Sequence, residues 1–298
     1  MTAHSRVLAV LIVFFLWVAP GVSATPHAAP TAATPAFWVV EGNGATLYLL
    51  GSVHLLPPEM KWSTPAIDAA RAQAEVFVFE APLKDADNAM ASFVDKYGHL
   101  AVGKTLKDLL SAKEYEDLET ASWSVQYPPK LLANVRPWLA AVFLELYSYL
   151  KIGYSSHYGV DHVIERAASA QGKTLAYFET VDQQLAYFLK LSPRDELAFL
   201  KSTVRDILEK PDAPVELVDA WALGDTEKLS QLIETGMASV PQLKAQLLVA
   251  RNREWVPQIL TMLRSGRVHF VTVGAGHLVG KESVVRLLRA KGVKVTGP

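Results

Sequence analysis

Residues 46–54 read Thr46-Leu47-Tyr48-Leu49-Leu50-Gly51-Ser52-Val53-His54, an apolar run that stops at a glycine and reaches a histidine three residues later. Near-continuous aliphatic runs are typical of strands that are covered on both faces of a sheet. In open α/β sheets, ligands bind just beyond the carboxyl ends of such strands. We therefore predict a buried strand that places His54 at a functional edge of the sheet.

The same pattern returns near the other end of the chain. Val268-His269-Phe270-Val271-Thr272-Val273 leads into Gly274-Ala275-Gly276-His277, a second apolar run followed by a Gly-x-x-His turn. Glycine beside each histidine permits a close approach of the backbone to a ligand. If both strands lie in one sheet, the imidazoles of His54 and His277 meet at one edge, within the span of a shared metal ion.

The residues before the first stretch predict a hairpin. Phe37–Glu41 and Thr46–Leu50 are apolar runs separated by Gly42-Asn43-Gly44, whose residues accept the positive φ of a tight turn. The opening of the fold is therefore expected to be antiparallel.

The residues after the first stretch predict a crossover. Ser63-Thr64-Pro65 is an N-terminal cap for a helix that runs to about Ala74, and Val76–Glu80 is a further buried strand whose last residue is charged. The order strand, helix, strand indicates a right-handed connection between a parallel pair of strands. Glu80 then lies at the same sheet edge as His54.

The middle of the chain has helical character from about residue 85 to 263. Within this region, Thr174–Glu179 is predicted to form one more strand. Glu179 is the last residue of that strand, as Glu80 is of the earlier one. A final strand, helix and strand follow at residues 268–273, 281–289 and 293–295. The apolar residues that recur at helical spacing predict core positions: Leu106, Leu109, Leu110, Tyr115, Trp138, Val142, Phe143, Leu146 and Tyr149.

Composition excludes several classes of protein. Half of the 298 residues are hydrophobic and the formal net charge is −1, whereas a nucleic-acid-binding surface normally shows a basic excess. The chain has no cysteine, so disulfides, thiolate metal ligands and cysteine nucleophiles are all excluded. Any chemistry must use histidine, carboxylate, hydroxyl or basic side chains.

The N-terminus reads as a signal peptide. Arg6 precedes the apolar run Val7–Ala19, and Val22-Ser23-Ala24 supplies the small residues before a cleavage site. The run is shorter than the roughly 20 residues that span a bilayer, so no stable membrane anchor is expected. We predict a signal peptide over residues 1–24, a flexible leader over 25–36 and a single domain over 37–298. The protein is then periplasmic or secreted.

Four ionisable side chains follow predicted strands: His54, Glu80, Glu179 and His277. Imidazole and carboxylate together suit a divalent cation such as Mn, Co, Zn or Fe, and a hydrolytic site also needs an open coordination position for water. The remaining histidines do not share this context, although His157 and His162 flank Gly159 and Asp161, where a local role is open.

The two Gly-x-x-His turns, together with Glu80, resemble those of the TraB/PrgY/GumN family, to which the Tiki-type metalloproteases are related. The resemblance covers nearly all of the mature chain, and the signal peptide without a membrane span is most like the GumN branch. It also rests on four further segments: Gly159-Val160-Asp161, Phe178-Glu179-Thr180-Val181-Asp182-Gln183-Gln184, Arg251-Asn252-Arg253-Glu254-Trp255 and Leu278-Val279-Gly280.

The resemblance implies an α/β fold of the erythromycin-esterase-like and ChaN-like group. In this fold a central mixed sheet is built from N- and C-terminal strands, with a large helical insertion here over about residues 85–263. It also implies divalent-metal peptidase chemistry that depends on two motif histidines and a glutamate. The corresponding residues in this sequence are His54, His277 and Glu80.

Two functions are therefore expected to compete. In a metal-dependent hydrolase of peptides or small molecules, His54, Glu80 and His277 bind the metal, Glu179 is the general base and Arg251 stabilises the developing oxyanion. The sequence does not decide which of Glu80 and Glu179 is ligand and which is base. In the alternative, a non-catalytic ligand-binding or regulatory protein uses the same crevice. Neither of these functions determines the oligomeric state.

Overall fold

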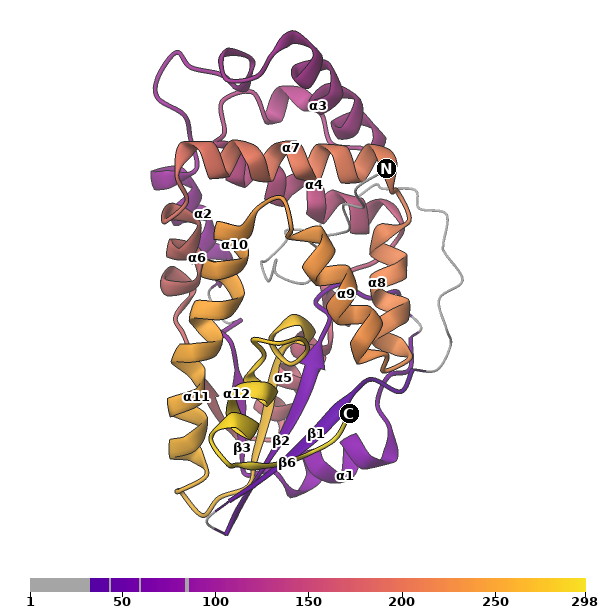
Figure 1. Cartoon of the computed structure of the whole chain (residues 1–298), viewed down its shortest axis with the longest axis vertical. Coiled ribbons are helices and arrows are strands. Elements are labelled where there is room, and N and C mark those ends of the chain that lie inside the picture. Colours follow the sequence, from indigo (N-terminus) through magenta and orange to yellow (C-terminus); the bar gives the residue numbers. More distant parts are fainter. Residues whose placement is uncertain (1–32, 43, 59, 84–85) are drawn as a thin grey trace.

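A computed structural model of the chain describes residues 33–42, 44–58, 60–83 and 86–298. The predicted signal peptide and most of the predicted leader lie outside these residues. A β-sheet forms one end of the molecule, and helices extend from it to the other end (Figure 1).

The sheet is mixed and has six strands in the order β4-β3-β5-β2-β1-β6. The three central pairings, β4 with β3, β3 with β5 and β5 with β2, are parallel, whereas β1 is antiparallel to both β2 and β6. This confirms an α/β fold whose sheet combines N- and C-terminal strands. The strands are β1 (Phe37–Gly42), β2 (Ala45–Ser52), β3 (Val76–Phe79), β4 (Thr174–Tyr177), β5 (His269–Gly274) and β6 (Lys294–Thr296).

The predicted hairpin is confirmed. Strands β1 and β2 pair from Phe37 opposite Leu50 to Gly42 opposite Ala45, and Gly44 in the turn has a φ of 78°. That conformation favours glycine, which is why the turn can be so tight.

The predicted parallel pair of β2 and β3 is wrong in one respect. The two strands are parallel, but β5 lies between them and pairs with both. Every residue of β5 is buried, and its Phe270 stacks on Phe77 of β3, with 5.7 Å between the ring centroids. A strand this apolar is most stable at the centre of a sheet, where both faces and both edges are covered.

Helices surround the sheet and form the opposite end of the molecule. Between β3 and β5 the chain contributes ten of the described helices and the single strand β4. The helices are α1 (Pro65–Gln73), α2 (Ala86–Tyr97), α3 (Ala112–Ser124), α4 (Pro137–Lys151), α5 (Val160–Ala170), α6 (Val181–Leu189), α7 (Pro193–Glu209), α8 (Ala213–Ala222), α9 (Thr226–Gly236), α10 (Pro241–Lys244), α11 (Arg251–Met262) and α12 (Val284–Ala290).

Short helical turns connect several of these elements. Five of them are described: η1 (Leu106–Asp108), η2 (Pro129–Leu131), η3 (Ser156–Tyr158), the π-helical η4 (Ala245–Ala250) and η5 (Ala275–His277).

Helix α4 forms the centre of the helical end, and α7 packs against it (Figure 1). Trp138, Val142, Leu146 and Tyr149 are buried there, as the helical spacing predicts. The prediction for Leu109 is wrong: this side chain is 40% exposed. Leu109 directly follows η1, a turn too short to bury a continuous stripe of apolar side chains.

Helix α6 lies within the predicted helical region, but the sequence analysis gave no bounds for it. Thr180 caps its start: the Thr180 hydroxyl accepts from the Gln183 N–H at 3.1 Å, and the Gln183 side chain accepts from the Thr180 N–H at 2.8 Å. This reciprocal capping box is a recognisable sequence signal. The helix brings Gln184 and Tyr187 over the edge of the sheet.

Candidate functional site

Both Gly-x-x-His turns begin at the same edge of the sheet. Ser52, at the end of β2, lies opposite Gly274, at the end of β5. A Cβ on Gly51 would stand 2.9 Å from Cα of Ala275, so only glycine lets the two turns approach this closely. The edge therefore carries His54 two residues beyond β2 and His277 at the end of η5.

The two glutamates lie side by side at the same level. Glu80 directly follows β3, and Glu179 comes two residues after β4. The ladder between the strands continues here, because the N–H of Glu179 donates to the carbonyl of Glu80 at 2.9 Å.

Arg251 joins the two carboxylates. Its guanidinium donates through Nη2 to Glu80 Oε2 at 2.5 Å and through Nε to both oxygens of Glu179 at 3.0 Å. The side chain is 1% exposed and stacks on the ring of Trp255, 4.7 Å from its centroid. Its Nη1 also donates to the carbonyl of Leu247, in the π-helical turn η4, at 3.2 Å. Such turns are frequent at functional sites because they reposition one side chain.

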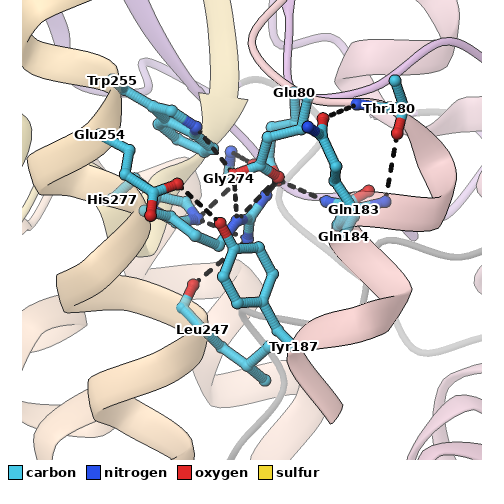
Figure 2. Close-up of polar contacts among 12 residues, drawn as sticks. Glu80, Thr180, Gln183, Gln184, Tyr187, Leu247, Glu254, Trp255, Gly274 and His277 are labelled. Carbon is cyan, nitrogen blue, oxygen red and sulfur yellow. Dashed lines mark hydrogen bonds and ion pairs between the residues drawn. The ribbon is translucent and has the colours of Figure 1, made fainter. Parts of the chain in front are cut away.

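The Glu80 carboxylate accepts from three partners, Arg251, Gly274 and Gln184. Figure 2 shows its carboxylate between Gly274 and Gln184: Oε1 accepts from the Gly274 N–H at 2.6 Å, and Oε2 accepts from Gln184 Nε2 at 2.9 Å. Burial by itself would raise the pKa of Glu80, but the charge of Arg251, the two histidines and the Gly274 N–H outweigh it and lower the pKa to about 2. Glu80 is therefore a carboxylate at any physiological pH.

Glu179 has the opposite pKa shift. Burial raises its pKa, and the nearby charge of Glu80 adds to this, which together outweigh the lowering by Arg251 and by the hydrogen bond from Trp255 Nε1 at 2.9 Å. Two carboxylates of one cluster thus have pKa values that are pushed apart, a pattern typical of an acid or base beside a fixed anion.

The tautomer of His277 is set by Asn252. Nδ2 of Asn252 donates to the carbonyl of Glu282 at 2.9 Å, which turns Oδ1 toward His277 Nδ1, 2.6 Å away. His277 Nδ1 must therefore carry the proton, and Nε2 is an acceptor whose donor is Arg251 Nη1. Burial lowers the pKa of His277 to about 3, so the ring is neutral. Nε2 lies 3.2 Å from Arg251 Nη1 and 3.8 Å from Glu80 Oε1.

His54 is held in a similar way by Asp161. Its Nδ1 lies 3.0 Å from Asp161 Oδ1, within ion-pair distance although the N–H direction is not ideal for a hydrogen bond. Gly159 makes this contact possible, because a Cβ there would stand 2.3 Å from the carbonyl oxygen of His54. Burial lowers the pKa of His54, but Asp161 and Glu80 outweigh it, so the net shift is upward.

The structure thus brings four of the five predicted residues into direct contact, namely Glu80, Glu179, Arg251 and His277. His54 interacts with Glu80 and His277 through its charge, and neither of its ring nitrogens has a hydrogen-bond partner among the described residues. Within the same part of the chain, no three His, Asp or Glu side chains are already grouped as a metal site. Metal binding by His54, Glu80 and His277 therefore stays a prediction.

Sequence reasoning assigned no role to several residues that complete the cluster. All of them except Tyr187 lie inside the motifs quoted above, but no spacing rule indicates that they contact the site, since they reach it from α5, α6 and α11. These residues are Asp161, Gln184, Tyr187, Asn252 and Trp255.

The fold and the cluster together define an α/β protein with a buried His, Glu and Arg site at the carboxyl edge of its parallel strands. The chain belongs to the TraB/PrgY/gumN family, whose profile matches residues 36–297.

A Metalloprotease TIKI homolog from Amphimedon queenslandica is 26% identical over a stretch that covers 46% of this chain and 32% of that protein. The chain therefore matches about a third of this relative's length. No solved structure matches the chain significantly. Among the helices that the structure describes, none is long and apolar enough to cross a membrane.

Proposed function

We propose that this protein is a metal-dependent hydrolase that cleaves a peptide or amide-like bond at the cluster around Glu80. The observation that best supports this is the pair of imidazoles held through Nδ1, His54 by Asp161 and His277 by Asn252. Partners of this kind fix the tautomer of metal-binding histidines and leave Nε2 as the ligand atom. The relative that is named a metalloprotease adds support.

The residues present fit a divalent cation. Nε2 of His54 is buried and has no partner among the described residues, and Glu80 is ionised. Two imidazole nitrogens and a carboxylate are ligands that Mn, Co, Zn and Fe accept, and His54 would lose its proton on binding the ion. His54, Glu80 and His277 would hold the ion. Arg251 competes for the same atoms, because it now donates to Glu80 and His277.

The protein's own side chains supply the remaining chemistry. A divalent cation held here supplies Lewis acidity toward the scissile carbonyl. Glu179, whose pKa is raised, accepts a proton from the attacking water on a carboxylate oxygen and returns it to the leaving nitrogen. The Arg251 guanidinium stabilises the negative charge that develops on the carbonyl oxygen, in a site from which water is largely excluded.

A second candidate is a non-catalytic ligand-binding or regulatory role on the same fold. One observation favours it: Arg251 already neutralises Glu80 and Glu179 and donates to His277, which gives a buried cluster that is satisfied without a metal. In this case a ligand binds at the same cluster without turnover.

Metal analysis followed by a digest of an unbiased peptide library at neutral pH, with Mn, Co, Zn or Fe added, tests the proposal. We expect stoichiometric metal and cleavage in the wild type and loss of both in His54→Ala. His99→Ala, which changes an exposed loop histidine, is the matched control and should behave as wild type. Absence of both metal and cleavage in the wild type would favour the binding protein.

We also propose a cellular location and a fold group for this protein. A signal peptide over residues 1–24 would export the domain of residues 37–298, with its helical insertion at about 85–263, to the periplasm or beyond, where peptides are accessible as substrates. The fold would belong to the erythromycin-esterase-like and ChaN-like group. Intact mass should show an exported protein that begins at Thr25, and a membrane-fixed species that retains Met1 would contradict this.

A further inference from the structure

A cavity of about 210 Å³ opens between the end of α3, the middle of α4 and the junction of α7 with α8. None of the candidate site residues lines it. Its volume is below the ~300–1,000 Å³ of typical drug-sized ligand sites, so it suits a small molecule. Its walls are mostly aliphatic, and they include Val125, Ile152, Ile207 and Pro214.

Two buried carboxylates line this cavity. Glu145 of α4 is 6% exposed and Asp206 of α7 is 7% exposed. Asp206 Oδ1 has no hydrogen-bond partner among the described residues. Burial raises the pKa of Glu145 to about 8, and the charge of Asp206 contributes to this shift. Such groups are costly to bury unless a partner completes them.

The cavity also presents a buried donor. Nζ of Lys210 has no hydrogen-bond partner among the described residues and lies 3.8 Å from Asp206 Oδ1, a separation too long for a good hydrogen bond. Lys151 lines the cavity as well. Above the pKa of Glu145 the two carboxylates balance the two ammonium groups. At lower pH an ammonium group of a ligand beside Glu145 favours its ionised form and so restores this balance.

We propose that this cavity binds a small zwitterion of the α-amino-acid class with an aliphatic side chain. The ligand's ammonium group contacts Glu145 and Asp206, its carboxylate contacts Lys210, and its side chain packs on the aliphatic wall. This supplies hydrogen bonds to Asp206 Oδ1 and Lys210 Nζ, which have none among the described residues. The inference does not depend on the proposed hydrolase activity, because it uses none of the same residues.

Calorimetric titration of the full chain with L-leucine tests the proposal. Two analogues each lack one charge: 3-methylbutylamine lacks the carboxylate and 4-methylpentanoate lacks the ammonium group. We expect saturable binding of leucine and at least about tenfold weaker binding of each analogue, since each loses a charge-assisted hydrogen bond. Equal affinity for all three ligands, or no saturable binding of leucine at up to about 20 mM, would overturn the proposal.

Variants then locate the site. Glu145→Gln and Lys210→Met should each weaken leucine binding by about tenfold or more, whereas binding of 3-methylbutylamine should respond to the first and not to the second. Glu114→Gln is the matched control, because Glu114 lines a separate groove between α3 and α7 and should leave leucine binding unchanged. If Glu145→Gln does not fold, Lys210→Met at the partly exposed lysine decides the test. Leucine binding that is unchanged in the folded variants would refute the site.

Discussion

At the scale of single residues, Arg251 balances the charge of the candidate site. It is fully buried between Glu80 and Glu179, and breaking a buried ion pair by removing one partner costs about 3–5 kcal/mol because the other charge is left uncompensated. We expect Arg251→Met to lower the free energy of unfolding by this amount, as measured by chemical denaturation. Arg253→Met, an exposed change on the same helix, should stay within about 0.5 kcal/mol of the wild type. Equal effects of the two variants would contradict this.

Asn252 controls His277 and so provides a second prediction. Asn252→Ala removes the acceptor for Nδ1–H, and loss of such an outer partner costs about 10–100-fold in metal affinity. We expect this loss in a titration with Mn or Co, together with a change of the His277 tautomer in ¹⁵N NMR spectra. Asn134→Ala, in an exposed loop, serves as control. An unchanged tautomer with unchanged affinity would show that Asn252 does not position His277.

At the scale of elements, the close approach of β2 and η5 depends on Gly51. A methyl group there would meet the backbone of Ala275 at 2.9 Å, and overpacking of this kind costs about 1–3 kcal/mol. We expect Gly51→Ala to lose this much stability in denaturant titrations and to weaken metal binding. Gly42→Ala in β1 is the control, because its Cβ would meet only the flexible side chain of Leu263, at 3.6 Å. Wild-type stability of Gly51→Ala would disprove the steric argument.

The packing of α4 against α7 predicts a pH dependence of stability. The pKa of Glu145 is raised from 4.5 to about 8, with Asp206, Lys151 and Lys210 as its charged neighbours around the cavity. The folded state therefore keeps a proton that the unfolded chain releases, so this residue's contribution to stability falls as pH rises from 4.5 to about 8. Wild-type and Glu145→Gln melting temperatures, measured across this range, should show a steeper fall in the wild type, because other buried carboxyls with raised pKa values, such as Glu165 and Glu179, remain in the variant. Parallel curves would contradict the prediction.

Sequence patterns indicated most elements correctly but not their adjacency. The hairpin, the first helix and the strands that end at Glu80 and Glu179 have local signals, namely glycine turns, caps and apolar runs. The position of β5 between β2 and β3 has no local signal, because the sequences of buried parallel strands resemble one another. For the same reason, the sequence placed Glu80 and His277 at one edge but could not show that Asn252 and Trp255 reach them from α11.

At the scale of the whole molecule, the candidate site connects the two ends of the domain. His54 follows a strand near the start of the described chain and His277 follows a strand near its end, and these strands are hydrogen-bonded neighbours. A metal ion that binds both histidines binds the folded state and not the separated strands of the unfolded state. Metal binding should therefore stabilise the entire domain rather than one loop.

Metal binding should raise the stability of the domain by a defined amount. At a free metal concentration of 100 times the dissociation constant, the free energy of unfolding should rise by about 2.7 kcal/mol, and chelation should reverse the rise. Calorimetry with Mn, Co or Zn measures it as an upward shift of the melting temperature. His54→Ala and His277→Ala should each abolish the shift, because either change removes the link between β2 and β5, whereas His99→Ala should keep it. A shift that persists in the two site variants would place the metal elsewhere in the protein.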